Sequence, residues 1–221
     1  MLSAAGVIVA SYVVGSVPIA YLVGRVTKGI DIREHGSGNV GASNVWQSVS
    51  RAIAVPVGLA QVAQGAAGVF IARAVGEPEG VQVAAGLAVV LAHDWNPWLR
   101  FTGGRGIGPA IGFMGALSLP ALVAFIVVAL AGIVLKAIPQ SIALALIGTP
   151  LAALVAADRS SVVLGLALLS VAVLLKRLLA NAAPDPAYPR PQVWLTRLVY
   201  DRDDPDRDAW VRRNLEPSMR R

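Results

Sequence analysis

Long apolar stretches alternate with short polar loops along the chain. Because crossing a bilayer takes about 20 apolar residues, six stretches are predicted to span a membrane: residues 2–24, 53–75, 81–99, 107–135, 138–157 and 161–179. The fourth is too long for one ordinary helix, and Ser118, Leu119 and Pro120 fall near its middle. Proline lacks a backbone N–H and disfavours helix before it, so two helices should meet there. The pattern predicts an all-α, polytopic integral membrane protein with about seven transmembrane helices.

Basic residues in the loops predict an orientation. Residues 25–52 contain four Lys or Arg residues and residues 93–106 contain two, whereas residues 76–80 contain none. Cytoplasmic loops carry the excess of positive charge, so the two basic segments should be cytoplasmic and the N-terminus should lie outside. Lys176 and Arg177 end the last stretch and place the C-terminus in the cytoplasm. An outside-to-inside path requires an odd number of crossings.

Composition supports the lipid bilayer as the chain's surroundings. Of the 221 residues, 56% are hydrophobic and only 14% are charged, against about 25% charged in soluble domains. The net charge of +6 fits loops that face anionic lipid, and no nucleic-acid partner is expected. The chain has no cysteine and two histidines, so neither disulfides nor an ordinary metal site is expected.

After residue 181 the chain changes character and becomes rich in Pro, Arg and Asp. We predict a transmembrane domain over residues 1–181 and a cytoplasmic tail over residues 182–221. The tail should be peripheral, partly disordered and without catalytic residues. Within it, residues 193–200 could form a short amphipathic helix at the membrane surface.

The first basic loop contains a run of small and polar residues, Gly36-Ser-Gly-Asn-Val-Gly-Ala-Ser-Asn44. Glycines allow tight turns that expose backbone N–H groups, and such groups suit a phosphate. The alternative is a flexible linker with a polar turn, but we favour phosphate binding. The run also fits a Gly-x-Gly-x-x-Gly pattern, yet no strand–helix unit surrounds it, so a dinucleotide fold is not expected.

The second basic loop brackets one cation with glycines, in the order Gly103, Gly104, Arg105 and Gly106. A guanidinium there could grip phosphate oxygens through two parallel hydrogen bonds. His93 opens this segment and could be a base, a phosphate ligand or a helix-capping donor; the sequence leaves the three open. Trp95 and Trp98 are predicted to be anchors at the membrane interface.

The end of the first apolar stretch carries the polar residues Ser16, Tyr21 and Arg25. Polar residues near a membrane core are candidates for function. Arg25 could equally be an anchor that extends its charge to the interface.

These segments together resemble a known family, the acyl-phosphate-dependent glycerol-3-phosphate acyltransferases called PlsY. The resemblance rests on the order and spacing of Gly15-Ser-Val-Pro with Tyr21 and Arg25, of residues 29–44, and of residues 93–106. It implies an integral membrane enzyme of the bacterial plasma membrane that moves an acyl group from acyl phosphate to the 1-hydroxyl of glycerol 3-phosphate. The products would be lysophosphatidic acid and phosphate, and no metal or coenzyme would take part.

By position, the resemblance supplies two sets of site residues. The expected catalytic residues are Ser37, Asn39, Asn44 and His93. The expected substrate-binding residues are Ser16, Arg25, Gly36, Gly38, Gly41, Gly103, Gly104, Arg105 and Gly106.

The sequence departs from the family pattern at several charged positions. Gln47 stands in place of an Arg, and Gln61 and Gln64 stand in place of an Asp and a Lys. A terminal Arg-His-Arg-x-Asn cluster is reduced to Arg177 and Asn181. Because both substrates are anions that need cations nearby, two alternatives remain: a catalytically impaired paralogue that binds phosphate-bearing lipid precursors, and a small membrane transporter. The sequence does not indicate an oligomeric state.

Overall fold

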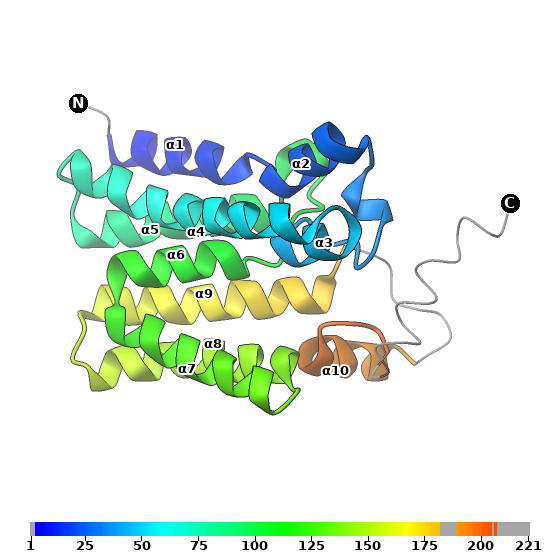
Figure 1. Ribbon diagram of the computed structural model, residues 1–221. Helices are drawn as coiled ribbons and strands as arrows, with labels where there is room; N and C mark the ends of the chain where they lie inside the picture. The colour runs from blue at the N-terminus through cyan, green and yellow to red at the C-terminus, as the bar shows by residue number, and fades with distance from the viewer. Residues whose placement is uncertain (1–2, 182–188, 205, 207–221) are drawn as a thin grey trace, which may run out of the picture.

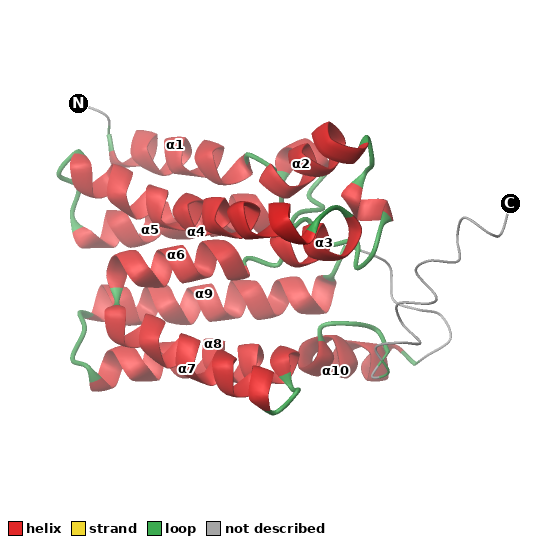
Figure 2. Cartoon of the chain, in the orientation of Figure 1, coloured by secondary structure: helices red, strands yellow, loops and turns green. Residues whose placement is uncertain are grey.

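The structure, a computed structural model, describes residues 3–181, 189–204 and 206. These residues form helices joined by loops, without a strand (Figures 1 and 2). The helices are α1 (Ala4–Ser16), α2 (Ile19–Lys28), α3 (Ala42–Ser48), α4 (Arg51–Ala74), α5 (Glu79–Asp94), α6 (Ile107–Leu117), α7 (Leu119–Val134), α8 (Ile138–Val155), α9 (Ser160–Leu179) and α10 (Arg190–Tyr200), with 3₁₀ turns η1 (Ile32–Glu34) and η2 (Pro97–Leu99). The predicted all-α class is confirmed.

Four stretches are long and apolar enough to cross a membrane, namely Ala4–Lys28, Arg51–Ala74, Ile138–Val155 and Ser160–Leu179. Helices α6 and α7 are apolar but shorter. On α7 and α8, large apolar side chains such as Val127 and Leu151 point outward and are about 60% exposed, as suits contact with lipid. The number of crossings, about seven, stays a prediction.

The predicted break in the fourth stretch is confirmed at Ser118. This residue is extended (φ −148°, ψ 99°) and separates α6 from α7. Its hydroxyl oxygen accepts a hydrogen bond from the Ala121 N–H at 3.2 Å, which caps α7. The same hydroxyl donates to Asp158 at 2.5 Å and so ties the break to the α8–α9 turn.

The first stretch, predicted as a span over 2–24, overlaps the candidate span Ala4–Lys28, but it is not one continuous helix, because the helix breaks at Val17 and Pro18. Pro18 has no N–H and disfavours helix at the residue before it. The break interrupts the regular helical hydrogen bonds at the end of α1 and opens carbonyls there to a further donor. The amide of Gln64, on α4, donates to three of them, those of Val14 (2.7 Å), Gly15 (3.3 Å) and Val17 (3.1 Å).

The long helices lie side by side and run between two ends of the bundle (Figure 1). One end carries the N-terminus, the α4–α5 and α8–α9 turns, and the α6–α7 break. The other end carries both glycine-rich loops, the end of α9 and α10 (Figure 1). The chain thus starts at one end of the bundle and the last long helix, α9, finishes at the other, as an odd number of crossings requires. Which face is cytoplasmic stays a prediction.

Two apolar clusters hold the parts that position these loops. The larger cluster contains side chains from every helix from α4 through α9 and includes the buried residues Phe113, Phe125 and Leu166. The smaller one includes Ile32 and Leu99, and it packs the first loop against α2, α4 and η2. The glycine-rich loops therefore rest on a packed base.

The described part of the C-terminal segment packs against the bundle. Helix α10 contacts α8 and α9, and its Arg197, which is 2% exposed, donates to the Leu178 and Leu179 carbonyls at 3.1 and 3.2 Å. The predicted helix at 193–200 is confirmed, and Trp194 and Leu195 on it are exposed. Its place at a membrane surface and the domain boundary at 181 stay predictions, and residues 182–188 and 207–221 of the predicted tail lie outside the described residues.

Candidate active site

The first glycine-rich loop is built around the side chain of Asn44, which is fully buried. Its Nδ2 donates to three backbone carbonyls at 2.9 to 3.0 Å, those of Ile32, His35 and Asn39. Its Oδ1 accepts from the Ser37 N–H and the Ser48 hydroxyl, both at 3.1 Å. Every polar atom of Asn44 is thus engaged within the protein, and the loop takes its shape from these bonds.

The glycines of this loop occupy positions that other residues would strain. Gly36 and Gly38 have φ of +57° and +66°, in the left-handed region that glycine tolerates. A Cβ at Gly36 would also collide with the Asn44 side chain. Asn39 is 7% exposed, and its carboxamide oxygen has no hydrogen-bond partner among the described residues. The loop therefore keeps one buried polar group available.

A carboxylate with two arginines ties this loop to its neighbours. Asp31 pairs with Arg33 at 2.7 Å and with Arg25 at 3.2 Å. Hydrogen bonding from Arg33 is the main cause that lowers the pKa of Asp31 below its ordinary value. Arg33 also donates to the Leu99 carbonyl (3.3 Å) and the Thr102 hydroxyl (3.1 Å), so it joins the first loop to the second.

The second loop lies directly on the end of α5, where His93 and Asp94 are buried. The Gly104 N–H donates to the His93 carbonyl at 3.0 Å, and a Cβ on Gly104 would overlap the His93 imidazole. Gly106 (φ +68°) starts α6 against the Asp94 carboxylate. Both carboxylate oxygens of Asp94 lack a hydrogen-bond partner among the described residues. Glycines at 104 and 106 are required for this close approach.

Asn181, just after α9, links the two loops directly. Its Nδ2 donates to the Gly38 carbonyl at 3.3 Å and to the Gly103 carbonyl at 2.8 Å. Its Oδ1 accepts from the Lys176 ammonium at 3.0 Å. Lys176 is 2% exposed and lies over the Trp95 ring, 5.4 Å from its centre. In the sequence, Lys176 was recognised only as a marker of orientation, because its contact with Asn181 depends on the turn that follows α9.

Arg105 points to the C-terminal segment. Its guanidinium pairs with Asp201 at 2.5 Å, and the buried Arg177 lies 3.9 Å from the other oxygen of that carboxylate. Arg177 also donates to the Pro139 carbonyl at 2.9 Å. Asp201 was not predicted, since residues after 181 were expected to form a peripheral tail; the contacts of this segment with Arg105 and with α8 and α9 correct that expectation.

The remaining predicted residues lie beside these loops. Ser16 accepts a hydrogen bond from Trp98 Nε1 at 2.9 Å and donates to the Val13 carbonyl. Gln61 accepts from the Ala42 N–H at 3.3 Å. Gln47 is exposed on α3. Gln61 therefore supports the start of α3, within the first glycine-rich run, and Gln64 supports the end of α1.

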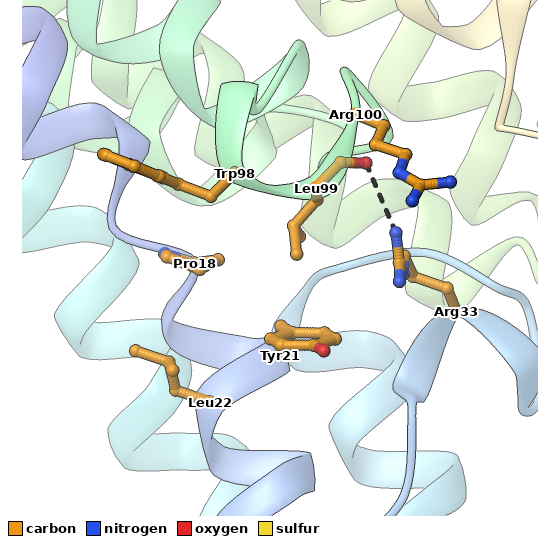
Figure 3. A pocket seen from close by; sticks show the side chains of 7 residues that line it. All are labelled: Pro18, Tyr21, Leu22, Arg33, Trp98, Leu99 and Arg100. Atoms are coloured by element: carbon orange, nitrogen blue, oxygen red, sulfur yellow. Dashed lines mark hydrogen bonds between the residues drawn. The ribbon is translucent and has the colours of Figure 1, made fainter.

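A pocket of about 530 Å³ opens beside the Asp31 network (Figure 3). Its walls come from α2, the first loop and η2, and they comprise Pro18, Tyr21, Leu22, Arg33, Trp98, Leu99 and Arg100. Among the described residues, no three His, Asp or Glu side chains gather as a metal site. The absence of a metal and a coenzyme stays a prediction.

Comparison with known proteins adds the family. Residues 5–182 match the family described as glycerol-3-phosphate acyltransferase. A Dehalococcoides mccartyi protein named glycerol-3-phosphate acyltransferase 4 is 33% identical, over 93% of this chain and 91% of its own. A Synechococcus protein named glycerol-3-phosphate acyltransferase is 36% identical, over 83% and 96%.

Solved structures agree with these relatives. The crystal structure of PlsY (YgiH), an integral membrane glycerol 3-phosphate acyltransferase, in its glycerol 3-phosphate form, superposes with a TM-score of 0.72 and 27% identity. The match covers 79% of this chain and 88% of that one. The lysophosphatidic acid form gives a TM-score of 0.71. The chain, an integral membrane protein whose two glycine-rich loops meet at Asn181, therefore belongs to the glycerol-3-phosphate acyltransferase family.

Proposed function

We propose that this protein transfers an acyl group from acyl phosphate to the 1-hydroxyl of glycerol 3-phosphate and releases lysophosphatidic acid and phosphate. The observation that carries the proposal is the joining of the two glycine-rich loops by Asn181 at one end of a membrane bundle. Solved relatives with glycerol 3-phosphate and with lysophosphatidic acid support the acceptor and the product.

The backbone of residues 36–41 and 103–106 would hold the phosphate of glycerol 3-phosphate. Glycines leave their N–H groups open to an anion, and Asn39 has an unused carboxamide oxygen for a substrate hydroxyl. Asn44 would shape the loop, since its own polar atoms are engaged. His93 would support Gly104, since it is buried beneath it.

The reaction needs few protein groups. The acceptor oxygen attacks the acyl carbon, the bond between that carbon and the phosphate oxygen breaks, and phosphate leaves with the electron pair. The hydroxyl proton passes to an oxygen of a substrate phosphate, so no protein base is required. The protein contributes by holding two anions at one place and by offsetting their repulsion.

Cations stand close enough to the loops for that task. Lys176 lies at Asn181, and Arg105 and Arg177 lie at Asp201. The Lys that the family pattern places at position 64 would face the carbonyls that end α1, as Gln64 does. Its replacement therefore removes no charge from the glycine-rich loops. This supports an active enzyme over a binding-only paralogue.

The protein would work in the bacterial plasma membrane, with both loops and the C-terminus in the cytoplasm. Glycerol 3-phosphate is water-soluble and would reach the loops from that side, whereas the acyl donor would come from the membrane. The start of α1 lies at the end of the bundle opposite the loops (Figure 1), and the basic residues of both loops support a cytoplasmic location for that end.

A direct assay tests the proposal. Purified protein in detergent, given labelled glycerol 3-phosphate and palmitoyl phosphate, should form labelled lysophosphatidic acid. An Asn181→Leu variant should lose most of this activity, whereas Arg159→Gln, at a 79% exposed position at the opposite end of the bundle, should retain it. No product above a heat-treated control, across acyl lengths and pH, would overturn the proposal. Binding of glycerol 3-phosphate without turnover would instead identify the binding-only paralogue.

A further inference from the structure

The pocket beside α2 combines an apolar surface with a cationic one. Pro18, Leu22 and Leu99 give it apolar walls, with the Trp98 ring at one edge (Figure 3). The guanidinium groups of Arg33 and Arg100 lie at its other edge, beyond the Leu99 carbonyl (Figure 3). A volume of about 530 Å³ is in the range of sites that bind small molecules.

The polar edge of the pocket carries surplus positive charge. Asp31 is the one carboxylate paired with Arg25 and Arg33. Among the described residues, no ion pair or hydrogen bond is recorded for Arg100, which is exposed. Glu34 also lies close enough to act electrostatically on Arg25 and Arg33, so three arginines stand against two carboxylates and a net charge of about +1 remains at this edge. An anion between the guanidinium groups would relieve their repulsion.

The backbone holds Arg100 in place. Arg100 and Phe101 have φ of 53° and 63°, a left-handed conformation that is uncommon for residues other than glycine. The surroundings enforce it: the Phe101 N–H donates to the Asn96 carbonyl at 2.8 Å, and the Asn96 side chain is bonded to Ser16 at 2.7 Å. Strained conformations that persist in this way gather at functional sites.

The rim of the pocket is apolar and exposed. Leu22 and Trp98, which line the pocket, are 46% and 71% exposed; Val26, one helical turn after Leu22, and Phe101, next to Arg100, are 84% and 61% exposed. In a membrane protein such side chains face acyl chains. A soluble phosphate has no apolar part that could contact these side chains. A molecule with a charged head and one hydrocarbon chain can contact the arginines and the apolar side chains at once.

We propose that this pocket binds a single-chain amphiphile through its phosphate head, which lies between Arg33 and Arg100 while its chain lies along Leu22 and Trp98. The inference rests on the proposed function, in which two molecules have this chemistry: the acyl phosphate donor and the lysophosphatidic acid product. The pocket would pass one or both between the membrane and the glycine-rich loops, to which Arg33 connects it through Thr102.

Arg100→Gln is the decisive variant, because Arg100 is exposed and its loss should not unfold the chain. Removing one charge-assisted contact should weaken binding of lysophosphatidic acid about ten-fold, measured by calorimetry in detergent. Arg51→Gln is the matched control, since Arg51 is also exposed at this end of the bundle but lies outside the pocket. Lysophosphatidylcholine, with the same chain and no net charge, should bind both proteins equally weakly.

Kinetics distinguish the two sources of the ligand. If the donor uses the pocket, Arg100→Gln should raise the KM for palmitoyl phosphate about ten-fold and leave the KM for glycerol 3-phosphate unchanged. If only the product uses it, product inhibition by lysophosphatidic acid should weaken while both KM values stay unchanged.

The pocket and the proposed enzymatic activity can be tested separately. Unchanged lysophosphatidic acid binding and unchanged KM for palmitoyl phosphate in Arg100→Gln would overturn the pocket even if the wild-type protein turns over normally. Conversely, a protein without turnover whose lysophosphatidic acid binding still depends on Arg100 would keep the pocket and reject the enzyme.

Discussion

Asn44 offers the sharpest test of how the first loop is built. Asn44→Ala removes both carboxamide atoms from five partners. Two of these, the carbonyls of Ile32 and Asn39, take part in fully buried hydrogen bonds, whereas the other three are partly buried and can reach water. A buried polar group left without a partner costs about 1–3 kcal/mol. The Ile32 carbonyl keeps the His35 N–H as a donor at 3.4 Å, so the substitution should lower the free energy of unfolding by about 1–3 kcal/mol, the cost of the Asn39 carbonyl alone.

A second substitution separates shaping of the loop from contact with substrate. Asn44→Asp keeps an acceptor for Ser37 but sets a carboxylate oxygen against three carbonyls, so it should destabilise the protein more than Ala does. The order of stability should be wild type, then Ala, then Asp, in denaturant unfolding of the detergent-solubilised protein. Hydrogen exchange at the Ser37 N–H should speed up in both variants, because Asn44 Oδ1 is its acceptor.

The control for this series is Ser43→Ala, one residue away and exposed, which should change stability by less than about 0.5 kcal/mol. If Asn44→Ala unfolds like this control while losing turnover, Asn44 acts on the substrate and the loop-shaping role is refuted. If it is destabilised and loses turnover in parallel, the structure's account holds.

Three further predictions address other parts of the site. Asp201→Asn frees Arg105 from an internal anion, so inhibition by inorganic phosphate should strengthen about two- to five-fold; no change would show that Asp201 does not compete with phosphate. Gly104→Ala places a Cβ against the His93 imidazole and should abolish turnover; wild-type activity would contradict the close approach. The pKa of Asp31 is lowered from 3.8, chiefly by hydrogen bonding, so its stabilising charge is complete above that pH and is lost as the pH falls through the lowered pKa. Acid unfolding curves of wild type and Asp31→Asn should therefore converge as the pH falls, and a constant separation would argue against the ion pair.

The helices could be predicted because their signals are local. Length and apolar composition placed the stretches within a few residues, and Ser118 with Pro120 marked a break that the structure contains. Pro18 carried the same local signal within the first stretch, but the stretch was of ordinary length and the break was not predicted. Only the contact with Gln64 shows how the broken end of α1 is stabilised.

The candidate site was predictable in composition but not in its internal contacts. The glycine runs, with Asn39, Asn44 and Arg105, were recognisable from spacing. The contacts of each side chain were not recognisable, since Asn44 turns inward to the loop backbone and Arg105 turns toward Asp201. A spacing pattern cannot indicate which polar atoms are already engaged.

By itself, the sequence determined the fold class, the two glycine-rich loops and the family, because each depends on residues close together along the chain. The tertiary structure decided which segments meet: Asn181 joins loops 65 residues apart, Lys176 lies beside it, and the segment after residue 188 returns to pair Asp201 with Arg105. The physical reason is that hydrogen bonds and ion pairs act over a few ångströms in space. Separation along the chain does not limit them, so a short-range pattern carries no record of these partners.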